Sequence, residues 1–201
     1  MEDLILVVNC SSSLFKATIL NSRSGDIVLS CLAAKLGQAD AYITFNRRGN
    51  RSTISLAEQP DHHGAAAELL EETRILGIER RIRAIGHRVV HGGEKYSGSV
   101  MITDDVIATL EECIPLAPLH NPANLTGIHA AQAIFPGLPN VGVFDTAFHQ
   151  TMPEHAYTYA IPRELYRKYG LRRYGAHGTS YRFVADETAR FLGKEIGRAH
   201  V

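Results

Sequence analysis

The first third of the chain alternates apolar and polar positions with a period of two, which predicts β-strands. Three such runs, residues 4–9, 15–20 and 26–33, are separated by the turn-like sequences CSSSL and NSRSG. The runs AYITF and STISL then flank Arg47-Arg48-Gly49-Asn50, a pattern typical of a further hairpin. The sequence therefore begins with a series of strands joined by short turns.

From His63 the apolar period lengthens to that of a helix, which Gly77 closes. The positions that define its face are Ala66, Leu69, Leu70, Thr73 and Leu76. This helix leads into an apolar strand that contains Arg88. Thr103-Asp104-Asp105 then opens a second helix, and the apolar residues on one side of it are Ile107, Leu110 and Ile114.

The clearest helix runs from Asn121 to Phe135: Asn121 is a capping residue type, Pro122 suits a first turn, and Pro136-Gly137 ends the helix. Its apolar face comprises Leu125, Ile128, Ala131 and Phe135. A short buried strand, NVGVF, follows and ends in Asp145. Strands in series followed by helix, strand, helix and strand predict an α/β fold with a mixed sheet flanked by helices.

After Phe148 the pattern changes, because HQTMPEHAYTYAIP carries two prolines and little periodicity, as a crossing between domains would. A short helix is expected over 164–168 and a longer one over 181–192. The inward face of the longer helix is expected to comprise Phe183, Val184, Thr188, Phe191 and Leu192. About 50 residues are too few for an independent core, so we expect one domain over 1–149 and the beginning of a second over 150–201.

Composition narrows the class of protein. The 201 residues carry equal numbers of basic and acidic side chains, which argues against nucleic acid or an anionic membrane as a partner. No apolar run approaches the roughly 20 residues of a membrane span, and the start lacks a basic leader, so a cytoplasmic protein is expected. Three widely spaced cysteines favour reduced thiols, and ten histidines without HExxH spacing give little support to a metal site made of histidines.

The segment GHRVVHGGEK contains the first candidate binding residues. Strand alternation places Ile82, Ala84, Gly86, Arg88 and Val90 on one face. A guanidinium beside a branched apolar side chain suits a small anion with a short apolar tail, since arginine grips carboxylates and phosphates bidentately. The alternative is that Arg88 is a structural residue paired with Glu94.

Two further segments could bind anions. The serines of NCSSSLFK lie in a turn whose hydroxyl and N–H groups could hold phosphate oxygens, with Lys16 adding charge, although serine-rich turns are more often structural. His120 precedes a helix start, where N–H groups favour an anion, and a histidine satisfied within a loop is equally consistent.

Two residues at element ends could carry catalysis. Asp145 ends a core strand, the place where α/β sheets tend to put catalytic or metal-linked acids, and this reading is favoured over a structural one. His177 lies between Gly175 and Gly178 before a helix, so its ring could reach into a cleft. His91 and His149 are expected to be structural or to support the site.

Five segments together resemble one family, the acetate and propionate kinases, whose fold is that of the sugar kinases, Hsp70 and actin and is ribonuclease H-like. They are LVVNCSSS, GHRVVHGGEK, APLHNPAN, VFDTAFHQTMP and YGAHGTS, in the family's order and spacing. The resemblance implies reversible phosphoryl transfer from ATP to acetate, or alternatively to propionate, with Mg²⁺ or Mn²⁺. It also implies a cytoplasmic homodimer. A non-catalytic carboxylate- or phosphate-binding module and a phosphatase of the same fold are the rival interpretations.

The resemblance also implies roles for individual residues. Asn9 would place the metal ion; Ser12, Ser13 and Lys16 would face the nucleotide phosphates. Arg88 would hold the substrate carboxylate, and Val90 and Leu119 would line the pocket for its apolar tail. The catalytic groups would be Asp145, His177 and His120.

The sequence departs from the family's pattern at a few positions. Ser11 stands where relatives have a glycine, and Leu14 where they have a third serine. Ala176 stands where they carry a phenylalanine, which implies a wider acyl pocket.

Overall fold

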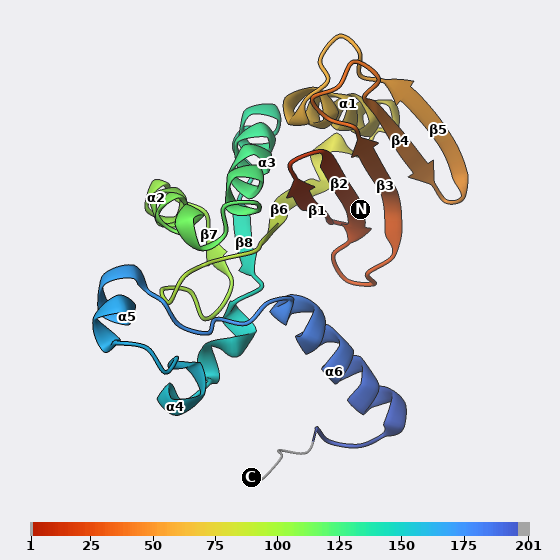
Figure 1. Ribbon diagram of the computed structural model, residues 1–201. Coiled ribbons are helices and arrows are strands. Elements are labelled where there is room, and N and C mark those ends of the chain that lie inside the picture. Colours follow the sequence, from red (N-terminus) through yellow and green to blue (C-terminus); the bar gives the residue numbers. More distant parts are fainter. Residues whose placement is uncertain (1, 197–201) are drawn as a thin grey trace.

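A computed structural model describes residues 2–196. Its centre is an eight-stranded sheet with the order β5-β4-β3-β2-β1-β6-β8-β7 (Figure 1). The strands are β1 (Leu4–Ser11), β2 (Leu14–Asn21), β3 (Ile27–Ala34), β4 (Tyr42–Arg47), β5 (Asn50–Ser55), β6 (Ile82–Val89), β7 (Val100–Met101) and β8 (Asn140–Phe144). The predicted strands are confirmed; β7, with two residues, is too short to show a period.

Strand direction divides the sheet into two parts. Strands β1 to β5 form an antiparallel meander, whereas β1, β6 and β8 are parallel neighbours and β7 is antiparallel to β8. This is the mixed sheet that the sequence predicts. Because the three parallel strands run the same way, their carboxyl ends meet at one edge of the sheet, where α/β proteins commonly bind ligands.

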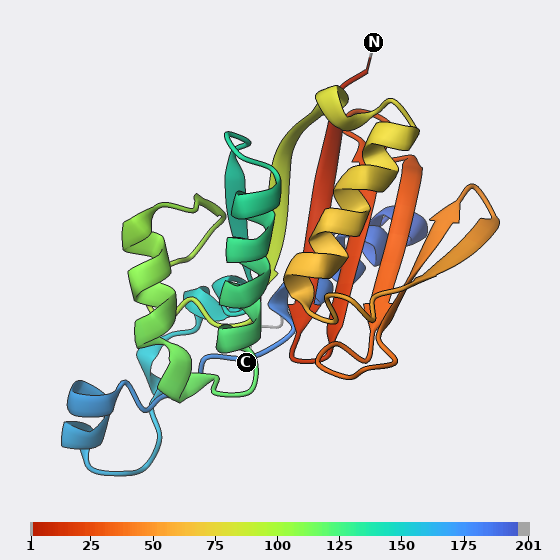
Figure 2. The same cartoon turned by 90° about the horizontal axis from the view of Figure 1, so that it is seen from above.

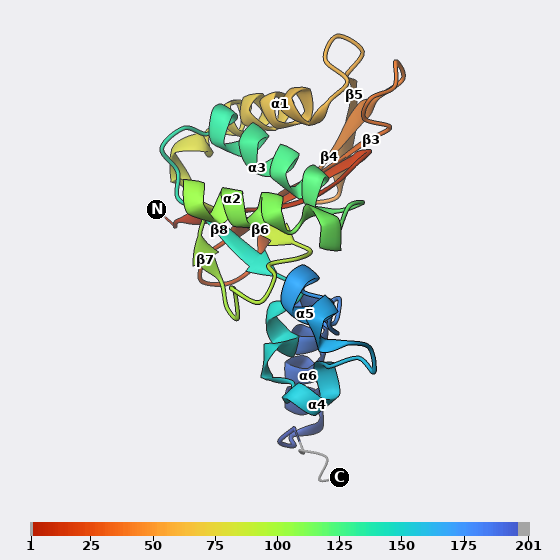
Figure 3. The ribbon, with the colours of Figure 1, turned by 60° about the vertical axis from the view of Figure 1, so that its left-hand side comes forward.

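Helices α1 (His62–Ile75), α2 (Asp104–Glu112) and α3 (Asn121–Ile134) lie on one side of the sheet (Figures 2 and 3). Helices α4 (Glu154–Tyr157), α5 (Arg163–Tyr169) and α6 (Gly178–Leu192) form a separate group after β8. The 3₁₀ helices are η1 (Glu79–Arg81), η2 (Ile114–Leu116) and η3 (Ala147–Thr151). The boundary expected near residue 149 falls within η3 and stays a prediction, and residues 197–201 of the expected second segment lie outside the described residues.

The core forms between the sheet and the helices. Leu4, Leu6 and Val8 of β1 point toward α1 and α3 and are buried, while the alternate residues face the other way. The predicted face of α3, from Leu125 to Phe135, is buried as expected.

Gly127 permits a close approach between α3 and β1. A Cβ at this position would lie 2.3 Å from the sulfur of Cys10. The absence of a side chain therefore sets how near α3 lies to the end of β1.

Several expectations about individual residues were wrong. Ile82 belongs to the core, because a register shift after the Leu4↔Ile82 pair moves it to the opposite face from Arg88. The N-cap of α3 is His120, and Asn121 is its first residue. Leu76 is exposed beyond the end of α1.

Helix α6 also differs from expectation. It begins at Gly178, three residues earlier than expected, and His177 occupies its N-cap position without a side-chain capping bond. Its supposed inward face is exposed, with Phe191 at 88% and Phe183 at 65%. The amphipathic pattern of this helix therefore has no packing partner among the residues described.

The cysteines and helix lengths complete the description. Cys10, Cys31 and Cys113 are buried and free, and burial raises the pKa of the Cys10 thiol to about 12. Over residues 2–196, no helix combines the length and apolar character needed to cross a membrane.

His87 predicts acid sensitivity of the fold. Its ring is buried in β6, where Nε2 lies 2.7 Å from the Asn140 amide oxygen, and burial lowers its pKa below 6.5. Between its folded pKa and 6.5 the unfolded chain therefore binds a proton that the folded chain does not. We expect stability to fall as pH drops from 7.5 to 5, with His87 contributing up to about 1.4 kcal/mol per pH unit.

Urea unfolding across this pH range measures the slope, and His87→Gln should reduce it. The exposed His129→Gln serves as the control. An unchanged slope in His87→Gln would mean that His87 does not titrate on unfolding.

Candidate active site

A cavity of about 630 Å³ opens at the carboxyl ends of the parallel strands. β1, β6 and β8 bring their ends together here, and the loops before α3 and α6 complete the walls. The residues expected from the sequence that line this cavity are Asn9, Arg88, Val90, Leu119, His120, Asp145 and His177. Segments far apart in the sequence thus converge on one cavity.

An ion pair between Arg88 and Asp145 forms the base of the cavity. The Nη2 and Nε groups of Arg88 donate to Oδ2 of Asp145 at 2.6 and 3.1 Å, and Nη1 lies 3.4 Å from Oδ1 of Asn9. The alternative pairing of Arg88 with Glu94 is wrong, because Glu94 accepts instead from Arg172.

The guanidinium of Arg88 has N–H groups that these contacts do not use. A guanidinium has five N–H donors, and three of them are accounted for by Asp145 and Asn9. Its side chain is 36% exposed, so the remaining two can reach a ligand in the cavity. Two donors on one guanidinium match the two oxygens of a carboxylate.

Asp145 is 1% exposed, and its Oδ1 has no hydrogen-bond partner. Its backbone is fixed from two sides, since its N–H donates to Val89 and its carbonyl accepts from Gly178, at 2.9 and 3.0 Å. A buried carboxylate oxygen without a partner is costly unless a ligand satisfies it. Asp145 therefore offers a free acceptor held rigidly beside Arg88.

The cavity wall is partly apolar. Val90 lies beyond the end of β6 on the same side as Arg88, which confirms the predicted shared face. Leu119 is 79% exposed at the opening, and Ala176 adds only a methyl group. These side chains leave room for a short apolar tail next to the guanidinium.

His177 reaches the cavity from a strained backbone. Its φ is +54°, in the left-handed region that residues with a Cβ seldom adopt, and its side chain is exposed. Gly178 comes so close to the Asp145 carbonyl oxygen that a Cβ there would lie 2.2 Å away. This contact fixes the start of α6, and with it the backbone of His177, against the segment that carries Asp145.

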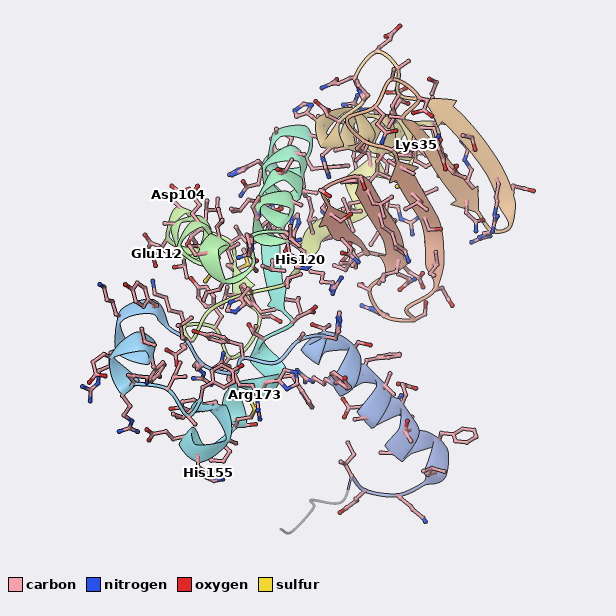
Figure 4. The ribbon with its side chains drawn as sticks, viewed as in Figure 1. Lys35, Asp104, Glu112, His120, His155 and Arg173 are labelled. Atoms are coloured by element: carbon pink, nitrogen blue, oxygen red, sulfur yellow. The ribbon has the colours of Figure 1, made fainter. Side chains whose placement is uncertain are left out.

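His120 occupies the start of α3 at the cavity, with an exposed side chain (Figure 4). The three residues expected to face phosphates lie elsewhere. Ser12 and Ser13 form the exposed turn between β1 and β2 and do not line the cavity, nor does Lys16. Lys16 is nevertheless paired directly with Asn9 across β1 and β2, which places the two side chains on the same face.

Sequence reasoning missed several residues that shape the site. Tyr174 lines the cavity and packs its ring edge-on against His91, and burial raises its pKa to about 12. Burial also lowers the pKa of His91, whose Nδ1 accepts from Gly93.

Asn121 and Asn124, both buried, bond to the backbone around the cavity. Their only signal in the sequence is two polar residues in the first turns of an otherwise apolar helix face.

His149 supports the part of the cavity wall that Gly175 and Ala176 form. Its Nε2 lies 3.1 Å from the Ala176 carbonyl oxygen, and its ring contacts the backbone at Gly175, where a Cβ would come within 2.3 Å. The expectation that His91 and His149 support the site is consistent with these contacts.

Fold and cavity together define a class: α/β proteins with a mixed sheet and, at the carboxyl ends of its parallel strands, a cavity that contains an arginine–aspartate ion pair. The acetokinase family model matches residues 4–200. Acetate kinase 1 of Neisseria meningitidis serogroup B is 64% identical over 96% of the chain. The chain belongs to the acetokinase family.

Solved structures agree with this assignment. A Francisella tularensis propionate kinase superposes with a TM-score of 0.92 at 40% identity, and a Porphyromonas gingivalis acetate kinase with 0.88 at 44%, each over 96% of the chain. The chain covers 50% of either structure and 49% of the N. meningitidis protein. It thus spans about half the length of these relatives.

Proposed function

We propose that these residues form the carboxylate-binding half of a kinase that transfers a phosphoryl group between ATP and acetate. The observation that supports this most is Arg88, with two free donors beside an apolar wall and a buried counter-ion. Charge and shape both fit a short-chain carboxylate better than a bare phosphate, because a phosphate has no apolar part to bury.

The chemistry needs little from the protein beyond position and charge. A carboxylate is already ionised at neutral pH, so an oxygen of acetate attacks the terminal phosphorus of ATP without losing a proton. The new O–P bond forms as the bond to the bridging oxygen breaks, and ADP leaves. Arg88 orients the nucleophile, and the exposed imidazole of His177 lies where charge develops.

A divalent cation fits the oxygen atoms near Arg88. Asn9 offers an amide oxygen and Asp145 a carboxylate oxygen without a partner, the donor types that Mg²⁺ prefers beside substrate phosphates and water. These two residues would hold the ion, which when bound neutralises charge on the phosphates. Ser12 and Ser13 would contact phosphates from the adjacent turn and Lys16 from β2, outside the cavity itself.

Cytoplasmic location and assembly as a homodimer are further parts of the proposal. Both come from the family resemblance. Size-exclusion chromatography with light scattering would test the dimer.

The proposed reaction is tested with hydroxylamine, which traps acyl phosphate formed from Mg-ATP and acetate. The full-length enzyme for this assay joins residues 1–192, which end with α6, to the second half of the N. meningitidis relative. We expect turnover in the usual range of roughly 1–10³ s⁻¹.

The outcomes distinguish the rival functions. The 201-residue chain alone should give no product, because it spans only about half the length of its relatives. Binding of acetate without turnover in the full-length enzyme would indicate a binding module. Hydrolysis of phosphate esters without acetate would indicate a phosphatase.

Ala176 predicts the choice between acetate and propionate. Its methyl group leaves space at the cavity wall, so Ala176→Phe should lower kcat/KM for propionate relative to acetate by about 10-fold or more, the scale of one methylene in a pocket. The ratio is measured in the full-length enzyme. Ala160→Phe, an exposed position outside the cavity lining, is the control; a ratio that does not move toward acetate contradicts the pocket assignment.

A further inference from the structure

Asn124 joins the ends of two strands that carry the site. It lies in α3 and is 4% exposed. Its Oδ1 accepts from the backbone N–H of Val90 at 2.9 Å, and its Nδ2 donates to the carbonyl of Cys10 at 3.0 Å. One side-chain amide therefore uses both its acceptor and a donor on two different segments.

The two bonds of Asn124 lie just beyond the point where the pairing of β1 with β6 ends. The parallel ladder between β1 and β6 is last paired at Val8↔His87. Beyond that pair the strands separate, and the amide of Asn124 occupies the gap with one bond to each side, as a peptide unit of an intervening strand would. It therefore holds the opening of the crevice between β1 and β6 at a fixed width.

The functional side chains lie directly next to these anchored groups. Asn9 precedes Cys10, and Arg88 lies two residues before Val90. The contact between Arg88 and Asn9 is long, at 3.4 Å, so it cannot by itself set the spacing of the two side chains. The two hydrogen bonds of Asn124, one to Val90 and one to Cys10, can set this spacing.

The neighbouring Asn121 shows that α3 is itself fixed to the same segment. It is fully buried; its Oδ1 accepts from the N–H of His91, and its Nδ2 donates to the carbonyls of His91 and Leu110. The side-chain bonds of Asn121 go to the segment after β6 and to α2, however, and not to β1. Asn124 is the one of the pair that reaches β1.

We propose that Asn124 is a positioning residue that sets the separation between Asn9 on β1 and the Arg88–Val90 segment, and through it the geometry of phosphoryl transfer. This inference rests on the proposed function. Displacement of a reacting group by about 1 Å can cost roughly 10²-fold in rate. Loss of the two Asn124 hydrogen bonds should therefore lower kcat by more than the loss of folded protein can explain.

The test compares variants in the full-length enzyme. Asn124→Leu is similar in size and removes both bonds, whereas Asn124→Asp keeps the acceptor for Val90 and loses the donor to Cys10. The control is Asn140→Leu, which removes an equally buried amide that bonds His87 and Leu138 at the other end of the sheet.

We expect Asn124→Leu to lower kcat roughly 10²-fold and to raise the KM for acetate. Asn124→Asp should lose kcat as well, with a smaller change in the KM for acetate because Val90 stays anchored. Asn140→Leu should lower the unfolding midpoint while leaving kcat and KM per folded molecule unchanged.

The inference is overturned if Asn124→Leu, corrected for its folded fraction, behaves like Asn140→Leu. A wild-type enzyme that forms no acyl phosphate overturns the proposed function itself, so the two failures are distinct.

Discussion

Replacing Arg88 with alanine is expected to destabilise the protein by about 2–4 kcal/mol, because it leaves the Asp145 carboxylate buried without its counter-charge. The value lies below that of a fully buried pair, since the Arg88 side chain is 36% exposed and solvent screens part of the interaction. Urea unfolding of the variant and of the wild type measures the difference.

The same change should also weaken catalysis. Loss of the charge-assisted grip on the carboxylate should cost roughly 2–4 kcal/mol in transition-state binding, seen as a fall in kcat/KM for acetate. Arg88→Ala combined with Asp145→Asn tests the cause of the lost stability. The double variant should regain most of the stability, because no charge is left unpaired, and should stay inactive, because both residues belong to the proposed site. Unchanged kinetics in Arg88→Ala would remove Arg88 from the site.

Gly127→Ala is the second change with a large expected effect. The new Cβ would lie 2.3 Å from the sulfur and 2.8 Å from the Cβ of Cys10. Overpacking of this kind costs about 1–3 kcal/mol, which outweighs the gain of up to about 1 kcal/mol from replacing glycine within a helix. We expect a net loss of stability, measured by thermal or urea unfolding.

Two further variants separate the clash from helix propensity. Cys10→Ala combined with Gly127→Ala should recover part of the loss, because the sulfur is removed. His129→Ala, on the exposed face of the same helix, should change stability little. Stability that rises in Gly127→Ala would show that α3 can move away from β1 at no cost.

The sequence predicted most of the elements, because periodicity reports which face of a strand or helix is buried. It placed Arg88 and Val90 on one face and put Asp145 at a strand end, so much of the cavity could be anticipated. Ile82 was misplaced because a register shift depends on the partner strand and leaves no local signal. Helix α6 shows a different limit. Its apolar stripe predicts a buried face, but the sequence does not tell whether the described residues include a surface that covers it.

Other features could not be predicted because they depend on contacts between distant segments. The pairing of Arg88 with Asp145 spans 57 residues, and a nearby Glu94 was an equally good partner by sequence. Asn121 has the residue type of a cap, yet its amide bonds the segment after β6, and His120 occupies the N-cap position without a side-chain capping bond. Local propensity cannot distinguish these uses of one side chain.

The left-handed backbone at His177 sets the stability of the fold against the catalytic role proposed for its side chain. Glycine adopts this conformation without penalty, whereas a residue with a Cβ pays on the order of 1 kcal/mol. A library of variants at this position selected only for heat resistance should accumulate glycine, and one selected for acyl phosphate formation should retain histidine. Under the proposed function, position 177 is therefore one where sequences selected for stability alone would lose the imidazole that the reaction uses.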